Sequence, residues 1–331
     1  MIDIGTVFTQ TLMLCILLIP GFLFRKLKIA PGEDGLAKGI SNIILYVAQP
    51  AMLISPYIRD FDSKILVNMG FAVLFSFLCH ALFLFPALLV FGLGKKAGGD
   101  EAGLTDEEKR RDLSTRVLRF AAVFGNCGYM GIPLIRNLLG DEATVYATVF
   151  NIGFQIFLWT FGCLIATGDK KYVSFKKIIL NPATISIFIG LIMFFTPLNR
   201  YVPGVVTGVL DMLKETVLPL SMFVVGFHMA GNRAKSFFTD GRMWVSMALK
   251  LLACPLLSFG LLKLFSATGI YNGFEVAVTV LLCSATPCAT VTSIFSEKFD
   301  LDRELAGRIV PLSTLISMAT LPLVALLLKL L

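Results

Sequence analysis

Long apolar stretches recur along the chain, and short charged connections separate them. A helix that crosses a bilayer needs about 20 mainly apolar residues, because each residue advances it by about 1.5 Å. The pattern predicts an all-α membrane protein with ten transmembrane helices, at 5–24, 36–55, 65–93, 115–138, 143–167, 181–198, 205–230, 242–265, 273–296 and 305–328. The first stretch is followed, not preceded, by Arg25, Lys26 and Lys28. A secretory signal has the opposite order, so we expect this stretch to stay in the membrane.

The charges of the connections predict an orientation. Most of the 29 Lys and Arg residues fall in alternate connections, and basic residues favour the cytoplasmic side of a membrane. We therefore expect both termini to lie outside the cytoplasm and the chain to reside in the inner membrane. The longest connection, roughly 95–114, is charged and contains glycine. We expect a cytoplasmic loop there, in which TDEEKRR forms one helical turn.

Composition excludes several other classes of protein. The 331 residues are 56% hydrophobic and 15% charged, with a mean hydropathy of +0.81, whereas soluble domains contain about 25% charged residues. The net charge of +7 does not indicate a nucleic-acid partner, because the basic residues form short clusters between apolar runs. The seven cysteines lie in apolar runs without a CxxC motif, and only two histidines are present. We expect no metal site and no cofactor.

Proline positions indicate an internal repeat. Pro50 and Pro219 have the same separation as Pro86 and Pro255, and each pair falls in corresponding stretches of two five-helix halves. We predict repeats at 1–168 and 169–331. Because five is odd, the second repeat would enter the membrane from the opposite side. Inverted repeats are typical of transporters, whose substrate binds near mid-membrane between the repeats.

The fourth stretch contains residues that interrupt a helix, namely Asn126, Cys127, Gly128, Gly131 and Pro133. Inside a helix, glycine costs about 1 kcal/mol and proline about 3 kcal/mol relative to alanine. The backbone groups that such a break frees need partners in the protein or in a cavity, because lipid offers none. We predict that this helix opens at mid-membrane.

The ninth stretch is its counterpart, with hydroxyl groups around one proline at Ser284, Thr286, Pro287 and Thr290. Two broken helices that cross would bring half-helix N-termini together, and their free N–H groups and positive dipole ends favour an anion. The alternative is that glycine and other small residues only allow close helix packing.

The segment GNCGYMGIPL, from Gly125 to Leu134, resembles the auxin efflux carrier family, as do LYVAQPAML in the second stretch and the overall length. That family lies within the bile/arsenite/riboflavin transporter-like superfamily, and its bacterial members include malate and malonate permeases. The resemblance implies ten helices in two inverted repeats, with the fourth and ninth helices broken and crossing at the substrate. It also implies a scaffold and a transport unit with elevator-like motion. The ninth stretch departs from the plant pattern, because it offers Thr286-Pro287 and no asparagine.

Other polar residues lie within the apolar stretches. Asn42, Tyr46 and Gln49 share one helix face and form a candidate wall of the site. Lys250 lies about 12 Å inside its stretch. It would attract a substrate carboxylate, pair with Glu215, or extend its stem toward the interface.

Two further polar groups have a simpler interpretation. Asp211, Lys214 and Glu215 would pair in water at the outer interface, although Glu215 is also a candidate for ion coupling. Asn151 and Gln155 lie one helical turn apart, so they would either hold neighbouring helices together or line the site, and we favour helix pairing.

These patterns predict a secondary transporter of a small organic anion, such as a carboxylate or an auxin-like weak acid. Candidate substrate-binding residues are Asn126, Cys127, Gly128, Gly131, Pro133, Thr286, Pro287, Thr290, Gln49, Tyr46 and Lys250, and candidates for H⁺ or Na⁺ coupling are Glu215, Asn42 and Ser284. The alternatives are a Na⁺-coupled symporter of the bile-acid-transporter type and a transporter-like ligand sensor. No catalytic constellation indicates an enzyme. The expected partners are the substrate and the lipid bilayer, and a homodimer is left open.

Overall fold

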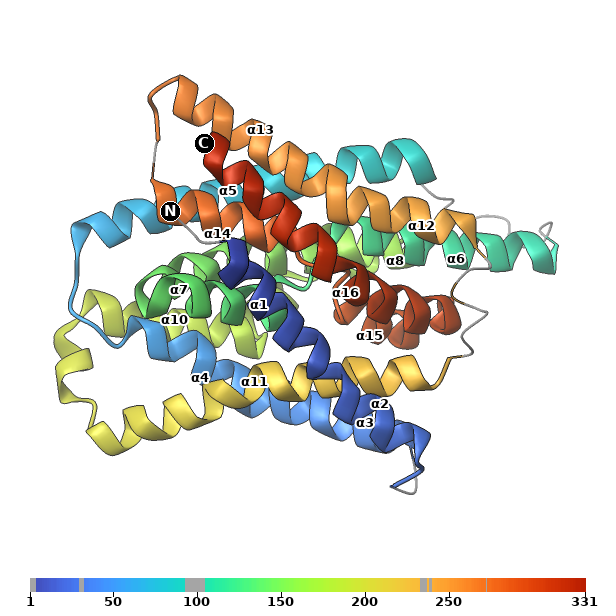
Figure 1. The fold of residues 1–331 in the computed structure, drawn as a ribbon, viewed down its shortest axis with the longest axis horizontal. Helices are drawn as coiled ribbons and strands as arrows, with labels where there is room; N and C mark the ends of the chain where they lie inside the picture. Colours follow the sequence, from blue (N-terminus) through green and yellow to red (C-terminus); the bar gives the residue numbers. More distant parts are fainter. Residues whose placement is uncertain (1–3, 30–32, 93–104, 233–236, 238–239, 272) are drawn as a thin grey trace.

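The computed structural model describes residues 4–29, 33–92, 105–232, 237, 240–271 and 273–331, which fold into helices that pack as two groups (Figure 1). The α11 group consists of α1 (Ile4–Ile16), α2 (Leu18–Lys26), α3 (Glu33–Ile43), α4 (Gln49–Ile54), α10 (Pro182–Phe195) and α11 (Gly204–Ala230). The α7 group consists of α5 (Ser63–Phe91), α6 (Asp106–Val123), α7 (Ile132–Phe157), α8 (Cys163–Thr167), α12 (Gly241–Ala248), α13 (Cys254–Ala267), α14 (Phe274–Ser284) and α15 (Val291–Lys298).

Two helices connect the groups. α16 (Arg303–Leu326) contacts α1 and α11 on one side and α14 and α15 on the other, and the short α9 (Phe175–Ile179) leads from α8 to α10. Figure 1 shows α3, α4 and α11 along the lower side of the molecule, and α12 and α13 along the upper side. Short turns complete the described chain, at η1 (Ile44–Ala48), η2 (Ser55–Tyr57), η4 (Cys127–Gly131), η5 (Leu158–Gly162), η6 (Lys170–Tyr172), η7 (Pro197–Tyr201), η9 (Leu249–Ala253) and η10 (Leu327–Leu330).

Seven helical segments of the described chain are long and apolar enough to cross a membrane: Gly5–Lys26, Gly35–Tyr57, Ser63–Phe91, Cys127–Thr167, Lys170–Phe195, Gly241–Ala267 and Arg303–Leu330. The prediction of a multi-pass, all-helical membrane protein is confirmed. The ten predicted stretches fall mainly on helices, and the fourth and ninth each cross a non-helical segment between two helices. The division into ten passes and the inverted repeat stay predictions.

The segment Cys127–Thr167 has 41 residues, about 60 Å of helix, which is twice the hydrocarbon thickness of about 30 Å. It is interrupted at Gly140, whose φ of 85° lies in the left-handed region and whose ψ is −176°. Residues other than glycine avoid this conformation, because their Cβ atom collides with the backbone. The kink falls between the predicted stretches at 115–138 and 143–167.

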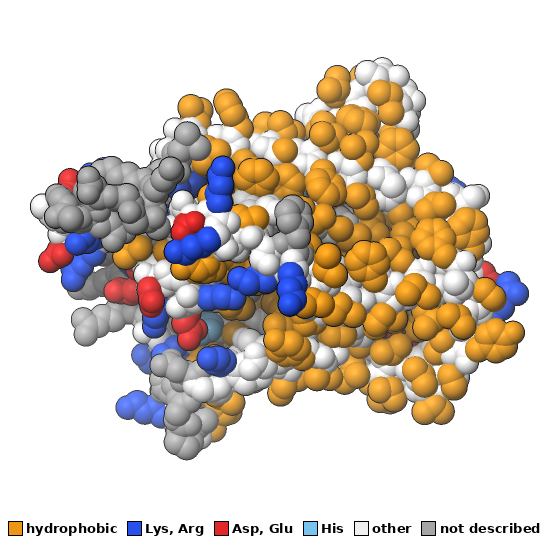
Figure 2. All heavy atoms as spheres, turned by 180° about the vertical axis from the view of Figure 1, so that it is seen from behind, with side chains coloured by type: hydrophobic (Ala, Val, Ile, Leu, Met, Phe, Trp, Pro, Cys, Tyr) orange, Lys and Arg blue, Asp and Glu red, His pale blue; other side chains and the backbone are white. Residues whose placement is uncertain are grey.

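The surface separates lipid-facing from charged regions. Large apolar side chains are exposed along the helices, among them Phe85, Leu89 and Val205, which are 69%, 74% and 79% exposed. Figure 2 shows a broad hydrophobic surface, with the Lys, Arg, Asp and Glu side chains of this face gathered mainly at one end. A soluble protein rarely exposes a patch of this extent, whereas a bilayer requires one.

Wide helical turns come directly before three prolines. The π-helical turns η1, η4 and η9 precede Pro50, Pro133 and Pro255. Proline has no N–H to donate, and its ring crowds the carbonyl four residues earlier, so the preceding turn widens. Pro86 and Pro219 lie inside continuous α-helices instead. The members of each proline pair thus differ in local structure, and these positions alone do not mark a repeat.

The loop predicted at 95–114 is wrong in its second half. α6 begins at Asp106, and Thr105 caps it: the Thr105 hydroxyl accepts a hydrogen bond from the Glu108 N–H at 3.3 Å. In return, Glu108 accepts one from the Thr105 N–H at 2.9 Å. Acidic residues in the first turn suit the positive end of a helix, so TDEEKRR starts a helix that continues into the protein. Residues 93–104 lie outside the described residues.

α2 and α11 touch backbone to backbone. A Cβ atom placed on Gly21 would lie 1.9 Å from the Phe223 carbonyl oxygen, and one on Gly226 would lie 2.0 Å from the Leu18 carbonyl oxygen. Neither obstacle is a flexible side chain that can move aside. Small residues that permit such close approach commonly drive helix association in membranes.

We predict that Gly226→Ala destabilises the protein by about 1–3 kcal/mol, because the methyl group forces the two backbones apart. The measurement is the thermal unfolding midpoint of the purified protein in detergent, which should fall by several degrees. Gly208→Ala is the matched control on the same helix, because nothing lies within 4 Å of its added Cβ. Equal midpoints for the two variants would contradict the predicted contact.

Candidate functional site

Two interrupted helices meet near the middle of the molecule. α6 ends at Val123 and α14 ends at Ser284, and the segments that follow them run antiparallel, with Gly125 opposite Cys288. The Asn126 N–H donates to the Pro287 carbonyl at 2.8 Å, and the Ala289 N–H donates to the Phe124 carbonyl at 2.9 Å. These bonds give the freed backbone groups the partners that lipid cannot offer. Both interruptions were predicted, but the first lies at 124–126 and not at Pro133, which sits in the first turn of α7.

Small and hydroxyl residues make this crossing compact. A Cβ atom on Gly125 would lie 2.7 Å from both the Lys250 Nζ and the Thr286 Oγ1, and one on Gly131 would lie 3.2 Å from the Cys283 Sγ. Thr286 donates its hydroxyl to the Cys283 carbonyl at 2.7 Å. The packing interpretation therefore has direct support for Gly125, Gly131 and Thr286.

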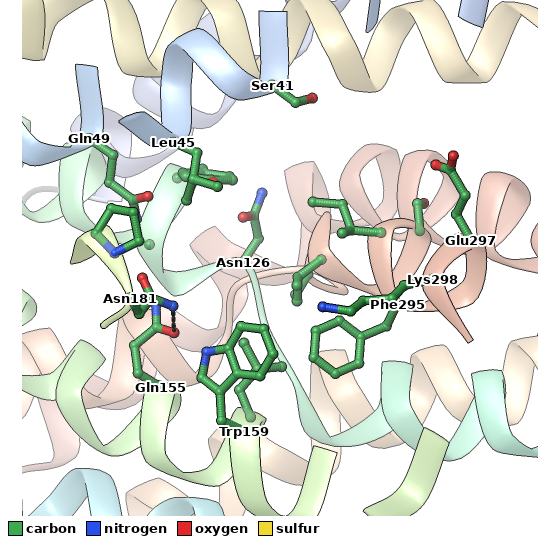
Figure 3. Close-up of a pocket in the computed structure, with 18 of the residues that line it drawn as sticks. Ser41, Leu45, Gln49, Asn126, Gln155, Trp159, Asn181, Phe295, Glu297 and Lys298 are labelled. Carbon is green, nitrogen blue, oxygen red and sulfur yellow. Dashed lines mark hydrogen bonds between the residues drawn. The ribbon is translucent and has the colours of Figure 1, made fainter. Parts of the chain in front are cut away.

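A cavity of about 890 Å³ lies between the α11 group and the α7 group. Among the predicted site residues, Asn42, Tyr46 and Gln49 line it from the α11 group, and Asn126 and Gly128 line it from the crossing. In Figure 3, Asn126 lies at the centre of this space, with Gln49 on one side and Lys298 on the other. The structure thus brings together residues that are far apart in the sequence.

The deep wall of the cavity carries polar atoms without partners in the described structure. They are the Gln49 Oε1, the Asn126 Nδ2, the Asn151 Nδ2 and the Trp159 Nε1, and the three amide side chains are at most 4% exposed. Leaving a buried donor or acceptor unpaired costs about 1–3 kcal/mol. We call Gln49, Asn126 and Asn151 the amide cluster. Of the four unpaired atoms on this wall, the Asn126 Nδ2, the Asn151 Nδ2 and the Trp159 Nε1 are N–H donors. The wall is therefore suited to an acceptor-rich ligand.

Gly128 leaves room beside the amide cluster. A Cβ atom at this position would stand 3.6 Å from the Gln49 Nε2 and from the Asn151 Oδ1. Gln155 follows on the same helix, and its Oε1 accepts a hydrogen bond from Asn181 at 3.2 Å, drawn as a dashed line in Figure 3. The predicted helix pairing is confirmed for Gln155. Asn151 and Gln155 also both line the cavity, and the Cys127 Sγ lies 3.6 Å from the Asn151 Oδ1.

The mouth of the cavity is basic, and an aromatic pair separates it from the amide cluster. Trp159 and Phe295 form a wall with ring centroids 5.5 Å apart, and the Lys298 ammonium lies 5.3 Å from the centre of the Trp159 ring. Further charged residues that line the mouth are Lys38, Lys176, Lys177, Glu297 and Arg303. The sequence reasoning used these cations only to orient the chain. Their position at the ends of predicted stretches was the available signal: Lys38 lies at the start of the second, Lys176 and Lys177 precede the sixth, and Lys298 and Arg303 lie between the ninth and tenth.

Several predicted site residues lie outside the cavity. Lys250 is 1% exposed and donates to the Ser284 carbonyl at 2.9 Å. The proposed pair between Lys250 and Glu215 is wrong, because Glu215 bonds Arg136 at 2.6 Å and its side chain is 61% exposed. Extension of Lys250 to the interface is wrong as well, given its burial. Thr290 borders a separate small hollow with Ser41.

The remaining predicted residues belong to the packed core, to the backbone of the crossing or to an ion pair. Cys127 is buried, and Pro133 and Pro287 belong to the backbone of the two interrupted helices. Asp211 and Lys214 pair at 2.6 Å, as expected for an outer interface. In the described part of the chain, no group of three His, Cys, Asp or Glu side chains is placed to hold a metal ion.

The helical fold defines a multi-pass membrane protein with a polar cavity between two helix groups. The profile of a family described as Membrane transport protein matches residues 6–175 and 167–325. The chain belongs to this family, the auxin efflux carrier family that the segment GNCGYMGIPL predicted. It is therefore a membrane transporter by family, a class of protein that is generally not enzymatic.

Similar proteins cover nearly the whole chain. An uncharacterized transporter of Methanothermobacter thermautotrophicus is 23% identical over 318 residues, which are 95% of this chain and 96% of that protein. A protein of Rhizobium meliloti named "Putative malonate transporter" is 24% identical over 315 residues, which are 92% of this chain and 90% of that protein.

We predict that Ser313→Ala weakens the crossing. The Ser313 hydroxyl accepts a hydrogen bond from the Cys288 N–H at 3.1 Å, and its removal leaves a buried donor unpaired, at a cost of about 1–3 kcal/mol. Thermal unfolding of the purified protein should show a lower midpoint. Ser317→Ala is the matched control, because Ser317 is equally buried on α16 and bonds only its own helix at Thr314 in the described contacts. An equal loss in both variants would refute a specific role for Ser313.

Proposed function

We propose that the chain is a secondary carrier of small organic anions, with short dicarboxylates of the malonate class as the first candidates. The observation that carries this proposal is the set of unpaired N–H donors on the deep wall of the cavity, beside the crossing of the two interrupted helices. Carboxylate oxygens accept hydrogen bonds from such donors, and bonds to a charged group are the stronger ones. The name of the Rhizobium meliloti relative supports the choice of malonate.

Electrostatics of the site also favour an anion. η4 begins at Cys127 and α15 begins at Val291, so two helix N-termini open at the cavity wall, where Gly128 and Val291 line it. Their positive dipole ends attract negative charge. Among the described lining residues, five are Lys or Arg and Glu297 is the single carboxylate. This excess of positive charge would raise the local concentration of an anion at the mouth.

The position of the cavity supports alternating access. It opens at the end that carries the basic residues, which the positive-inside bias assigns to the cytoplasm. At the other end, α7 and α11 are joined by the ion pairs Arg136–Glu215 at 2.6 Å and Asp141–Lys214 at 3.6 Å. We infer an inward-facing state, in which the α7 group moves against the α11 group to expose the site outside. The accompanying architecture would be ten passes in two inverted repeats, 1–168 and 169–331, with both termini outside.

The decisive experiment is counterflow into liposomes that contain the purified protein, with labelled malonate, malate and indole-3-acetate. Saturable exchange of a labelled anion supports a carrier. Tight binding of an anion without any counterflow would overturn it in favour of a ligand sensor.

We predict that Asn126→Asp abolishes uptake, because the carboxylate removes two donors and repels an anion. Asn126→Ala should reduce uptake about tenfold or more, since a hydrogen bond to a charged group contributes about 1.5–3 kcal/mol. Asn137→Asp is the matched control, because Asn137 lies nearby in the chain but bonds Gln10 at an exposed position. Uptake into liposomes is the measurement, and full activity of Asn126→Asp would remove the amide cluster from the site.

We predict that cutting the outer ion pairs shifts the carrier toward its outward-facing state. Exposed ion pairs contribute about 0.2–1 kcal/mol each, so loss of the two pairs should shift the populations by up to about thirtyfold. The test is labelling of Ser293→Cys, a cavity residue, by an impermeant thiol reagent from the cytoplasmic side. The background carries Cys15→Ser, because the other six cysteines are buried. Arg136→Gln combined with Lys214→Gln should slow this labelling.

Arg200→Gln is the control for this shift. Arg200 pairs with Asp60 at 2.9 Å at the same end of the molecule, and a hydrogen bond from Arg200 lowers the pKa of the Asp60 carboxyl. Arg200 lies in η7, between α10 and α11, and Asp60 lies in the connection from η2 to α5. Their pair does not join α7 to α11, so breaking it should leave labelling unchanged. Equal slowing in the control, or no slowing in the double variant, would contradict the proposed closure.

A further inference from the structure

A lysine lies buried behind the crossing, on no wall of the cavity. The Lys250 Nζ donates to the Ser284 carbonyl at 2.9 Å and lies 5.2 Å from the centre of the Phe83 ring. In the described structure, no Asp or Glu oxygen lies within 4 Å of this ammonium. An ionisable side chain inside the membrane normally pairs with an opposite charge or with backbone carbonyls, and it marks a functional position.

Oxygen atoms surround this position. Ser284 is the last residue of α14, so its carbonyl stands at the negative end of the helix dipole. The Ser284 hydroxyl accepts a hydrogen bond from Ser258 at 2.8 Å, and the Thr286 hydroxyl lies beside Gly125, next to the ammonium. In carriers built from broken helices, unwound carbonyls and half-helix C-termini are the groups that coordinate Na⁺. The groups around Lys250 are therefore of the kind that would otherwise hold a small cation.

We propose that the Lys250 ammonium is a resident cation, which occupies the place of a coupling Na⁺ at the end of α14. It neutralises the carbonyl end of α14 and packs against Gly125, so that both interrupted helices are held without a dissolved ion. Lys250 is then a positioning residue and not a substrate ligand. The transport consequence, which rests on the proposed carrier function, is that anion uptake does not require Na⁺.

Shortening the side chain separates this role from simple packing. Lys250→Ala removes the charge and empties the space, so the oxygen atoms of Ser284 and Thr286 become available to a cation. Lys250→Met also removes the charge, but its stem still fills most of the space. The alanine variant should therefore acquire a Na⁺ site, and the methionine variant should not.

The experiment measures the thermal unfolding midpoint of the full chain in detergent, in NaCl and in choline chloride of equal concentration. We expect the same midpoint in both salts for the wild type and for Lys250→Met. Lys250→Ala should have a lower midpoint in choline chloride and regain several degrees in NaCl, since a bound ion stabilises the folded state by mass action.

Two results would overturn the proposal. One is a wild-type protein that Na⁺ itself stabilises, a measurement that needs no variant to fold. The other is a Lys250→Ala variant that folds but responds equally to both salts. Uptake of labelled malonate by the wild type with Na⁺ replaced by choline gives a second readout, expected to be unchanged. Failure of all uptake would count against the carrier function alone, because the unfolding measurements do not depend on transport.

Discussion

The structure depends on one requirement of the bilayer, that every backbone N–H and C=O inside it has a partner. Two helices of this chain break that rule locally, and each supplies what the other lacks. The Asn126 N–H bonds the Pro287 carbonyl, and the Ala289 N–H bonds the Phe124 carbonyl. Neither helix can open alone without leaving bare polar groups in an apolar medium. The interruption, once made, exposes helix ends and amide side chains at a depth where charge is otherwise excluded.

The polarity of the interior is arranged around this crossing. Unpaired N–H donors, among them the Asn126 Nδ2, lie on the cavity side and have no acceptor in the described structure. On the opposite side the Ser284 carbonyl, an acceptor, is met by the ammonium of Lys250. The centre of the protein is therefore electropositive. The amide cluster presents N–H donors to the cavity, and the Lys250 ammonium neutralises the carbonyl end of α14. Such a field is established by folding, so an entering anion need not reorganise it.

Much of this was accessible from the sequence, and the reasons for the rest are physical. The length of the apolar stretches predicted the membrane helices, because a bilayer fixes how many apolar residues a crossing needs. The glycines and the proline near Asn126 predicted the interruption, because these residues destabilise a helix interior. The spacing of Asn42, Tyr46 and Gln49 correctly put polar residues on one wall. Which helices face one another is set by long-range packing, so Trp159 was missed and Lys250 was given the wrong partner. The charged start of α6 was taken for a loop because its helix gains stability from a cap and from tertiary contacts more than from apolar periodicity.

The contact between α2 and α11 has a consequence for how force travels. At Gly21 and Gly226 the two backbones meet with no side chain between them. Side chains absorb strain by changing rotamer, and a backbone contact has no such slack. α2 and α11 must therefore translate and tilt together as one rigid body. The ion pairs between α7 and α11 reach α11 at Lys214 and Glu215. A displacement of α7 at these ion pairs would thus be transmitted through α11 to α2.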